Sequence, residues 1–124
     1  MAHILVVDDS ATDQYVFKNV LEKNGHQVTV AKDGKQGVSL AKRLRPDLIL
    51  MDVVMPVLNG FQATRELARD DITHKIPIVM VTSKDAESDV EWAKRQGAMA
   101  YIVKPADEDR LIGCISRLLE GNSL

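Results

Sequence analysis

The sequence predicts an α/β fold built on a doubly wound, five-stranded parallel sheet. First, short apolar runs alternate five times with segments of helix length, the (βα)5 pattern. Second, runs such as residues 48–51 (Leu-Ile-Leu-Met) are apolar without interruption, which is typical of strands covered on both faces. Third, helix-length connections require neighbouring strands to be parallel, with right-handed crossovers. Together these observations indicate one open sheet between two layers of helices.

The five strands are predicted from aliphatic runs bounded by polar or turn-forming residues. Residues 3–7 run from His3 into four aliphatic side chains, whereas residues 27–31 alternate in polarity as an edge strand does. Pro46 ends the helix before the central strand, and Pro77 begins the fourth strand. The predicted strands span residues 3–7, 27–31, 48–51, 78–81 and 100–103.

The five helices are predicted from apolar stripes at helical spacing and from the residues that begin or end them. Thr12 or Asp13 is expected to cap the first helix, and Gly25 is expected to end it. Val16 and Leu44 are expected on the buried stripes of the first two helices. The predicted helices run from the first cap to about residue 24 and over residues 35–44, 61–68, 86–96 and 107–120.

Length and composition indicate one soluble domain, residues 1–124, without an output domain. The formal net charge of -2 and the pI near 5.9 argue against electrostatically driven binding to nucleic acid or to an anionic membrane. No apolar stretch approaches the ~20 residues of a membrane span, and the first strand begins too early for a signal peptide. The single cysteine, Cys114, fits a reducing cytoplasm, and its helical spacing predicts a small core residue.

Polar residues end four of the five predicted strands, and these residues form the candidate site. Asp8-Asp9, Asp52, Thr82 and Lys104 follow the first, third, fourth and fifth strands. Taken alone, Asp52 is most simply a polar strand end. Because parallel strands have their carboxyl ends at one edge of the sheet, however, these side chains are expected to converge in one crevice.

The charges of this site predict a bound cation. Carboxylates ~4 Å apart repel by about 4 kcal/mol per pair at an effective dielectric of ~20, and Lys104 supplies one positive charge against three acidic residues. A hard divalent cation with oxygen ligands, Mg²⁺ above all, would complete the balance. His3, His26 and His74 are scattered along the chain, so no cluster favours a softer metal. A metal and a lysine beside a carboxylate and a hydroxyl form a site for a phosphoryl group.

Four motifs at these strand ends resemble those of the receiver domain of two-component response regulators. They are Val7-Asp8-Asp9-Ser10, Leu50-Met51-Asp52-Val53-Val54-Met55-Pro56, Val81-Thr82-Ser83 and Tyr101-Ile102-Val103-Lys104-Pro105. The resemblance covers essentially the whole chain and implies the flavodoxin-like strand order 2-1-3-4-5. Within the family, residues 21–28, 59–65 and 84–97 look closest to the stand-alone, chemotaxis-like receivers of the PilH type, which act in type IV pilus twitching motility.

The resemblance implies a role for each residue of the candidate site. Asp52 would accept a phosphoryl group from the phosphohistidine of a histidine kinase, and Thr82 and Lys104 would bind the phosphoryl oxygens. Tyr101 would be the switch aromatic that turns inward when Thr82 moves, and the Lys104-Pro105 peptide bond is expected to be cis. The implied Mg²⁺ ligands are Asp8 (through water), Asp9, Asp52 and the main-chain carbonyl of Val54.

Side chains near the predicted acceptor indicate slow loss of its phosphoryl group. Val54, two residues after Asp52, cannot orient an attacking water, and Lys84, two residues after Thr82, cannot act as a base while protonated. Elsewhere, Trp92 is expected to pack rather than to contact a partner. For Tyr101, the role of an ordinary strand aromatic competes with the role of a switch.

The favoured interpretation is a phosphorylation-activated signalling switch rather than an enzyme. A histidine kinase or a histidine phosphotransfer domain would supply the phosphoryl group, and added negative charge would shift a pre-existing equilibrium. The output surface would be formed by the fourth helix, fifth strand and fifth helix. An unidentified target protein would bind there, or the chain would drain phosphate from a shared kinase, as a monomer or a phosphorylation-dependent dimer.

Two other functions are kept as alternatives. A small Mg²⁺-dependent phosphohydrolase with an aspartate nucleophile would use the same groups, but its usual Asp-x-Asp at the end of the first strand is absent. A flavodoxin-like cofactor binder would need a hydroxyl-rich phosphate loop after the first strand, which this sequence lacks. Turnover of a phosphomonoester without a kinase would favour the phosphohydrolase.

Overall fold

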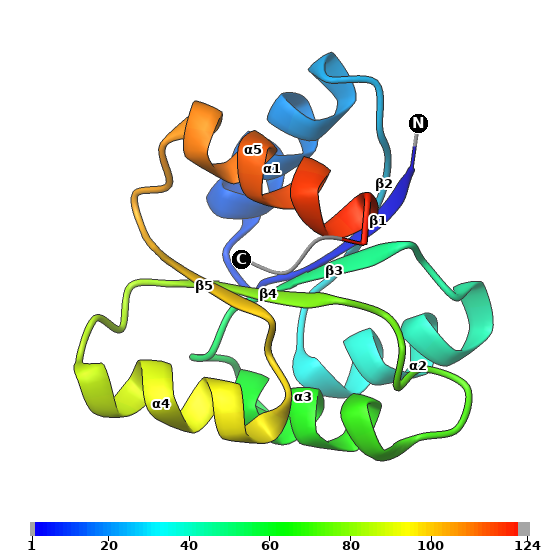
Figure 1. Cartoon of the computed structure of the whole chain (residues 1–124), viewed down its shortest axis with the longest axis vertical. Coiled ribbons are helices and arrows are strands. Elements are labelled where there is room, and N and C mark those ends of the chain that lie inside the picture. Colours follow the sequence, from blue (N-terminus) through cyan, green and yellow to red (C-terminus); the bar gives the residue numbers. More distant parts are fainter. Residues whose placement is uncertain (1, 122–124) are drawn as a thin grey trace.

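A parallel sheet of five strands with helices on both faces forms the centre of the molecule in the computed structural model, which describes residues 2–121 (Figure 1). Its strand order, β2-β1-β3-β4-β5, confirms the order that the receiver resemblance implies. The strands are β1 (His3–Val7), β2 (Gln27–Ala31), β3 (Leu48–Met51), β4 (Ile78–Thr82) and β5 (Ala100–Val103). The helices are α1 (Ala11–Lys23), α2 (Gly34–Leu44), α3 (Gly60–Arg69), α4 (Glu87–Gln96) and α5 (Glu108–Leu119).

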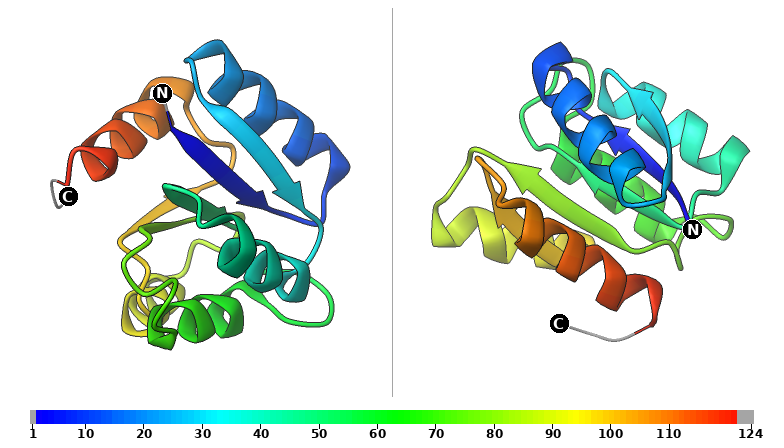
Figure 2. Two further views of the ribbon diagram at one scale, coloured as in Figure 1. Left: turned by 90° about the vertical axis from the view of Figure 1, so that its right-hand side faces the viewer. Right: turned by 90° about the horizontal axis from the view of Figure 1, so that it is seen from above.

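Two apolar layers hold the helices against the sheet. On β1, Ile4 and Val6 belong to the layer beneath α1 and α5, whereas Leu5 and Val7 belong to the layer beneath α2, α3 and α4 (Figures 1 and 2). All four side chains are buried, and each such burial contributes roughly 1.5–3 kcal/mol. Burial on both faces explains why the central strands are apolar without interruption.

Ser10 caps α1, so the predicted cap at Thr12 or Asp13 is wrong. Ser10 has an extended backbone, and its hydroxyl accepts a hydrogen bond from the Asp13 amide at 3.2 Å. The helix therefore begins at Ala11, directly after the first polar strand end, and Asp13 falls within its first turn.

Three apolar residues are more exposed than the sequence predicts. Val16 is 48% exposed because Phe17 and Leu21, one turn apart, occupy the buried stripe of α1. Leu44 is the last residue of α2 and is 38% exposed. Trp92 on α4 is 47% exposed, so packing within the chain covers only about half of its surface. These positions lie beside the buried stripes or at their ends, where helical spacing alone does not decide burial.

The other element boundaries agree with the predicted ones to within one residue. Gly60 begins α3 and Thr82 ends β4, each extending its element by one position. The second strand lies at an edge of the sheet, as predicted. Cys114 is partly rather than fully buried on α5, and the Lys104-Pro105 peptide bond is cis, as the resemblance implies.

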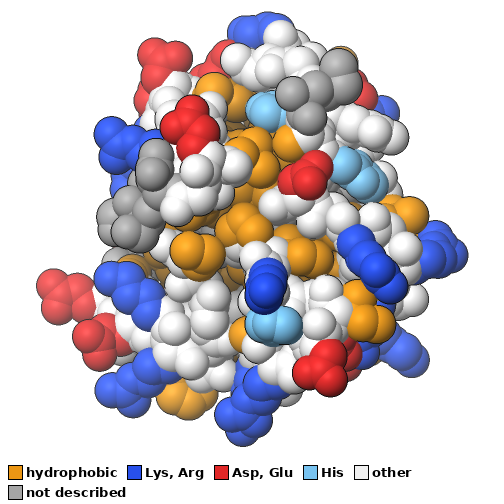
Figure 3. Space-filling view, turned by 45° about the vertical axis from the view of Figure 1, so that its right-hand side comes forward, with side chains coloured by type: hydrophobic (Ala, Val, Ile, Leu, Met, Phe, Trp, Pro, Cys, Tyr) orange, Lys and Arg blue, Asp and Glu red, His pale blue; other side chains and the backbone are white. Residues whose placement is uncertain are grey.

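Charged side chains of both signs are interspersed around apolar ones on the face drawn in Figure 3. This mixed pattern accompanies the small net charge of -2. Within residues 2–121, no helix combines the length and the apolar character needed to cross a membrane.

Candidate functional site

Asp8, Asp9 and Asp52 lie together at the carboxyl end of the sheet. The paired strands β1 and β3 end at Val7 and Met51, so the residues that follow them are neighbours. One carboxylate oxygen from each of the three residues lies within 4.8 Å of the other two. Asp8 and Asp52 are 2% and 8% exposed, whereas Asp9 is exposed. The structure thus brings these carboxylates together as the strand-end argument predicts.

Lys104 reaches into this acidic cluster from the end of β5. Its Nζ donates hydrogen bonds to Oδ2 of Asp8 at 2.7 Å, of Asp13 at 2.7 Å and of Asp52 at 3.0 Å. Burial by itself would lower the pKa of Lys104, but the hydrogen bonds to the three carboxylates raise this pKa well above its ordinary value. The ammonium group therefore stays charged beside Asp52.

The donor set of this cluster fits a hard cation. Burial raises the pKa of Asp8 above its ordinary value of 3.8, despite hydrogen bonds from Lys104 and from the Ser10 amide, and repulsion by Asp52 adds to the rise. The main cause is that burial disfavours the charged form of this carboxylate, and a cation beside it would favour that form. Their ligand atoms are oxygens alone, which is the preference of Mg²⁺.

A tight turn after β3 holds Asp52 in place. The Val53 amide donates to Oδ1 of Asp52 at 2.6 Å, and the Gly60 amide donates to the Val53 carbonyl at 2.9 Å. A Cβ atom at Gly60 would overlap the carbonyl oxygen of Asp52 and lie 2.8 Å from Cα of Val53. Val54 is exposed in this turn, and Val57 has a φ of 70°, a left-handed conformation that costs about 1–2 kcal/mol.

Thr82 is fully buried at the end of β4, beside the strand that carries Asp52. The pairing of Met51 with Met80 places Thr82 one residue further along the sheet than Asp52. Its Oγ1 accepts a long hydrogen bond, 3.4 Å, from the Lys84 amide. A hydroxyl both donates and accepts, so Thr82 can also donate to an anionic group at this edge.

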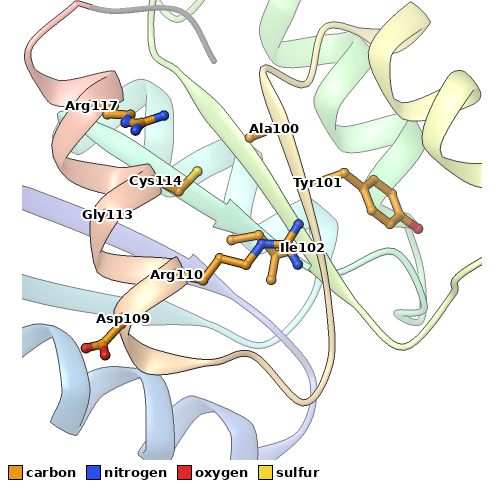
Figure 4. Close-up of a pocket in the computed structure, with 8 residues that line it drawn as sticks. All are labelled: Ala100, Tyr101, Ile102, Asp109, Arg110, Gly113, Cys114 and Arg117. Carbon is orange, nitrogen blue, oxygen red and sulfur yellow. The ribbon is translucent and has the colours of Figure 1, made fainter.

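Tyr101 contacts the same segment after β4. Its Oη donates to the Lys84 carbonyl at 2.8 Å. Figure 4 shows its ring on the side of β5 away from α5. Burial, together with nearby carboxylates of which Asp89 acts most strongly, raises the pKa of Tyr101 to about 12, so the phenol remains a donor. The inward turn of Tyr101 stays a prediction.

Asp13 is a site residue that the sequence argument missed. Its carboxylate contacts Lys104 although it was assigned a capping role. Asp13 lies on a helix, so the convergence of strand ends does not predict its position. The available signal is its spacing: Asp13 lies four residues before the buried Phe17, on the same face of α1 and close to the end of the first strand.

Comparisons with known proteins agree on one family. A family model for the response regulator receiver domain matches residues 4–116. Protein PilH of Pseudomonas aeruginosa is 54% identical over 121 residues, which cover 98% of this chain and 100% of that protein. The polar-differentiation response regulator DivK of Brucella anthropi is 33% identical over 116 residues, covering 94% of each chain. A solved receiver domain of a sensor histidine kinase from Pseudomonas aeruginosa, with a magnesium ion coordinated in its active site cleft, has a TM-score of 0.90 and 34% identity, covering 96% of this chain and 98% of that one.

Proposed function

The chain belongs to the response regulator receiver family, and on this premise we propose that Asp52 accepts a phosphoryl group from the phosphohistidine of a histidine kinase. Members of this family are phosphorylation-activated signalling switches, and the resemblance seen in the motifs is confirmed. One observation carries the assignment of Asp52: Nζ of Lys104 lies 3.0 Å from its Oδ2, within the acidic cluster. A carboxylate nucleophile and a fixed cation beside it are what transfer to an aspartate requires.

In the proposed transfer, a carboxylate oxygen of Asp52 bonds to phosphorus while the bond from phosphorus to the kinase imidazole nitrogen breaks. The electron pair of that bond leaves with the nitrogen. Lys104 and the hydroxyl of Thr82 stabilise the phosphoryl oxygens, while the Val53 amide orients the carboxylate. Mg²⁺, when bound, would neutralise charge between the carboxylates and the phosphoryl group. The residues proposed to hold it are Asp8, Asp9, Asp52 and Val54 through its carbonyl.

The Asp9→Asn variant is expected to bind Mg²⁺ about tenfold more weakly than the wild-type chain. In metal-free buffer the same variant is expected to be more stable, because it removes one of three carboxylates that repel one another. Both effects are measured by urea unfolding, with Mg²⁺ titrated or chelated. An unchanged Mg²⁺ affinity would remove Asp9 from the proposed ligand set.

The Mg²⁺-dependent gain in stability is expected to depend on pH. Because the pKa of Asp8 is raised in the folded chain, its ionisation lowers the stability of the metal-free protein as pH rises from 3.8 through the raised value. Mg²⁺ binds the ionised form, so protons compete with it. The gain in unfolding free energy on adding Mg²⁺ is therefore expected to increase as pH rises through the raised pKa of Asp8 and to shrink in more acidic buffer.

Thr82, Lys84 and Tyr101 provide the proposed route from the site to the rest of the molecule. The Lys84 amide donates to Thr82, and the Lys84 carbonyl accepts from Tyr101. A phosphoryl group that draws the hydroxyl of Thr82 toward itself would therefore strain both hydrogen bonds. The expected result is a shift between two arrangements of the β4–α4 segment.

The output surface is proposed on α4, β5 and α5. A cavity of about 330 Å³ opens between β5 and α5, with Ile102, Arg110 and Arg117 among its lining residues (Figure 4). Elsewhere on these elements, Trp92 on α4 and Val103 on β5 also expose apolar surface. Apolar side chains next to arginines are typical of protein interfaces, so the proposed target is a protein.

The phosphorylated chain is expected to lose its phosphoryl group over minutes or longer. Lys84 pairs with Asp89 at 3.7 Å and is not a base, while the side chain of Val54 is apolar. The Val54→Asn variant, which can hold a water near the acyl phosphate, is expected to shorten the half-life about fivefold. Intact mass spectrometry after donor removal measures both rates. A wild-type half-life of seconds would contradict this expectation.

The proposed setting is type IV pilus twitching motility or chemotaxis-like signalling in the cytoplasm. The 54% identity to PilH supports a role in twitching motility, and a lone, partly buried cysteine supports a place in the reducing cytoplasm. Residues 1–124 are proposed to act as one receiver domain whose donor is a histidine kinase or a histidine phosphotransfer domain. The alternative of a small phosphohydrolase is not favoured, because the family is one of signalling proteins.

The test of the proposed function is to locate the phosphoryl group on the chain. The protein is incubated with acetyl phosphate and Mg²⁺, reduced with borohydride to convert an acyl phosphate to homoserine, and digested for mass spectrometry. The expected product carries homoserine at position 52. Conversion at another aspartate, or no conversion, would overturn the assignment. Steady release of phosphate from phosphomonoesters would instead support the phosphohydrolase.

A further inference from the structure

We infer that Asp13, supported by Phe17, is a positioning residue that holds the ammonium group of Lys104 in place for the phosphoryl transfer. The inference rests on the function proposed for Asp52. Asp13 lies in the first turn of α1, whereas the other residues of the site lie at or just after the ends of strands. Even so, its Oδ2 lies 2.7 Å from Nζ of Lys104, as close as Oδ2 of Asp8 and closer than Oδ2 of Asp52 at 3.0 Å.

A closed ring of hydrogen bonds fixes the position of Asp13. The Ser10 amide donates to Oδ1 of Asp8 at 2.9 Å, and the Asp13 amide donates to Oγ of Ser10 at 3.2 Å. Lys104 completes the ring by donating to the carboxylates of both aspartates. The hydrogen bonds that cap α1 and those that hold Lys104 therefore belong to the same network. Any displacement of the first turn of α1 would move the ammonium group.

Phe17 supports Lys104 from the same helix face. Nζ of Lys104 lies 5.8 Å from the centroid of its ring, a distance at which a cation is attracted to an aromatic face. Phe17 follows Asp13 by four residues, so the two side chains are adjacent on α1. Phe17 is also buried in the apolar layer beneath α1, which makes it a rigid support.

The ammonium group of Lys104 has enough hydrogens to stay held by Asp8 and Asp13 while it also contacts the phosphoryl group. Lys104 has three N–H groups, and they are donated to Asp8, Asp13 and Asp52. Phosphorylation changes the acceptor at Asp52 and leaves the other two as they are. The third N–H can then pass from the carboxylate of Asp52 to a phosphoryl oxygen while Nζ stays where it is. A lysine held in this way has little conformational freedom left to lose during transfer.

The positioning role is tested with Asp13→Ala, Asp13→Asn and the control Glu22→Gln. Glu22 lies exposed near the other end of α1, so its variant removes the same charge away from the site. At saturating Mg²⁺, the Asp13→Ala variant is expected to bind beryllofluoride, a mimic of the acyl phosphate, about fivefold more weakly than wild type. Asparagine retains an acceptor oxygen, so Asp13→Asn and the control are expected to stay within about twofold of wild type.

The resonance of the Lys104 ammonium group supplies a second readout, measured in metal-free protein by NMR. Its hydrogens are expected to exchange with water slowly in wild type and Asp13→Asn, and rapidly in Asp13→Ala. An Asp13→Ala variant that matches wild type in both measurements, or binds beryllofluoride more tightly, would overturn the positioning role. An Asp13→Asn variant as weak as Asp13→Ala would also overturn it, because charge rather than anchoring would then be responsible. A wild-type chain that binds no beryllofluoride would count against the proposed function itself.

Discussion

The Asp52→Asn variant is expected to lose labelling by acetyl phosphate in the presence of Mg²⁺ by more than about a hundredfold. The physical reason is that the side-chain amide lacks the anionic oxygen that attacks phosphorus. The variant should keep its fold, because the amide oxygen can still accept from the Val53 amide or from Lys104. Mass spectrometry of the intact chain over a time course measures the rate of labelling.

The matched control for this substitution is Asp71→Asn. Asp71 is exposed in the segment between α3 and β4, which lies outside the candidate site. Its variant removes the same charge and is expected to be labelled at the wild-type rate. Persistent labelling of Asp52→Asn would show that another nucleophile accepts the phosphoryl group, with Asp8 and Asp9 the nearest ones.

The Gly60→Ala variant is expected to be destabilised by about 3 kcal/mol and to lose most of its labelling. A Cβ at this position would overlap the Asp52 carbonyl oxygen and approach the Asp52 carbonyl carbon to 2.8 Å. Both contacts are with main chain, which cannot move aside as a flexible side chain can. The turn after β3 must therefore open, and with it the hydrogen bond from the Gly60 amide to the Val53 carbonyl at 2.9 Å. Urea unfolding and the labelling assay measure the two losses.

Gly113→Ala is the control for Gly60→Ala. Gly113 lies inside α5, where a Cβ would meet nothing within 4 Å. Because alanine favours helix over glycine, this variant is expected to be more stable by about 0.5–1 kcal/mol. If both glycine variants behaved alike, the close approach at Gly60 would not be what restricts that position.

Much of the fold follows from local patterns in the sequence. The aliphatic runs fall within one residue of the observed strands because a strand buried on both faces leaves an uninterrupted apolar signature. The start of α1 could not be assigned in the same way. Ser10, Thr12 and Asp13 are all good caps, and the choice of Ser10 depends on its extended backbone. Val16 and the buried Phe17 are both apolar, so apolar character alone does not predict which of them is exposed. The exposure of Val16 depends on how α1 lies on the sheet.

The sequence alone determined that Asp8, Asp9, Asp52 and Lys104 meet, because parallel strands connected by helices must end at the same edge of a sheet. It also determined the family, since the four strand-end motifs occur together. The tertiary structure alone decided that Asp13 contacts Lys104. That contact joins residues 91 positions apart, and it depends on how α1 packs against β1 and β2 and on how far Lys104 reaches from the end of β5. Strand topology sets where strand ends converge, whereas the position of a helical side chain depends on how its helix packs.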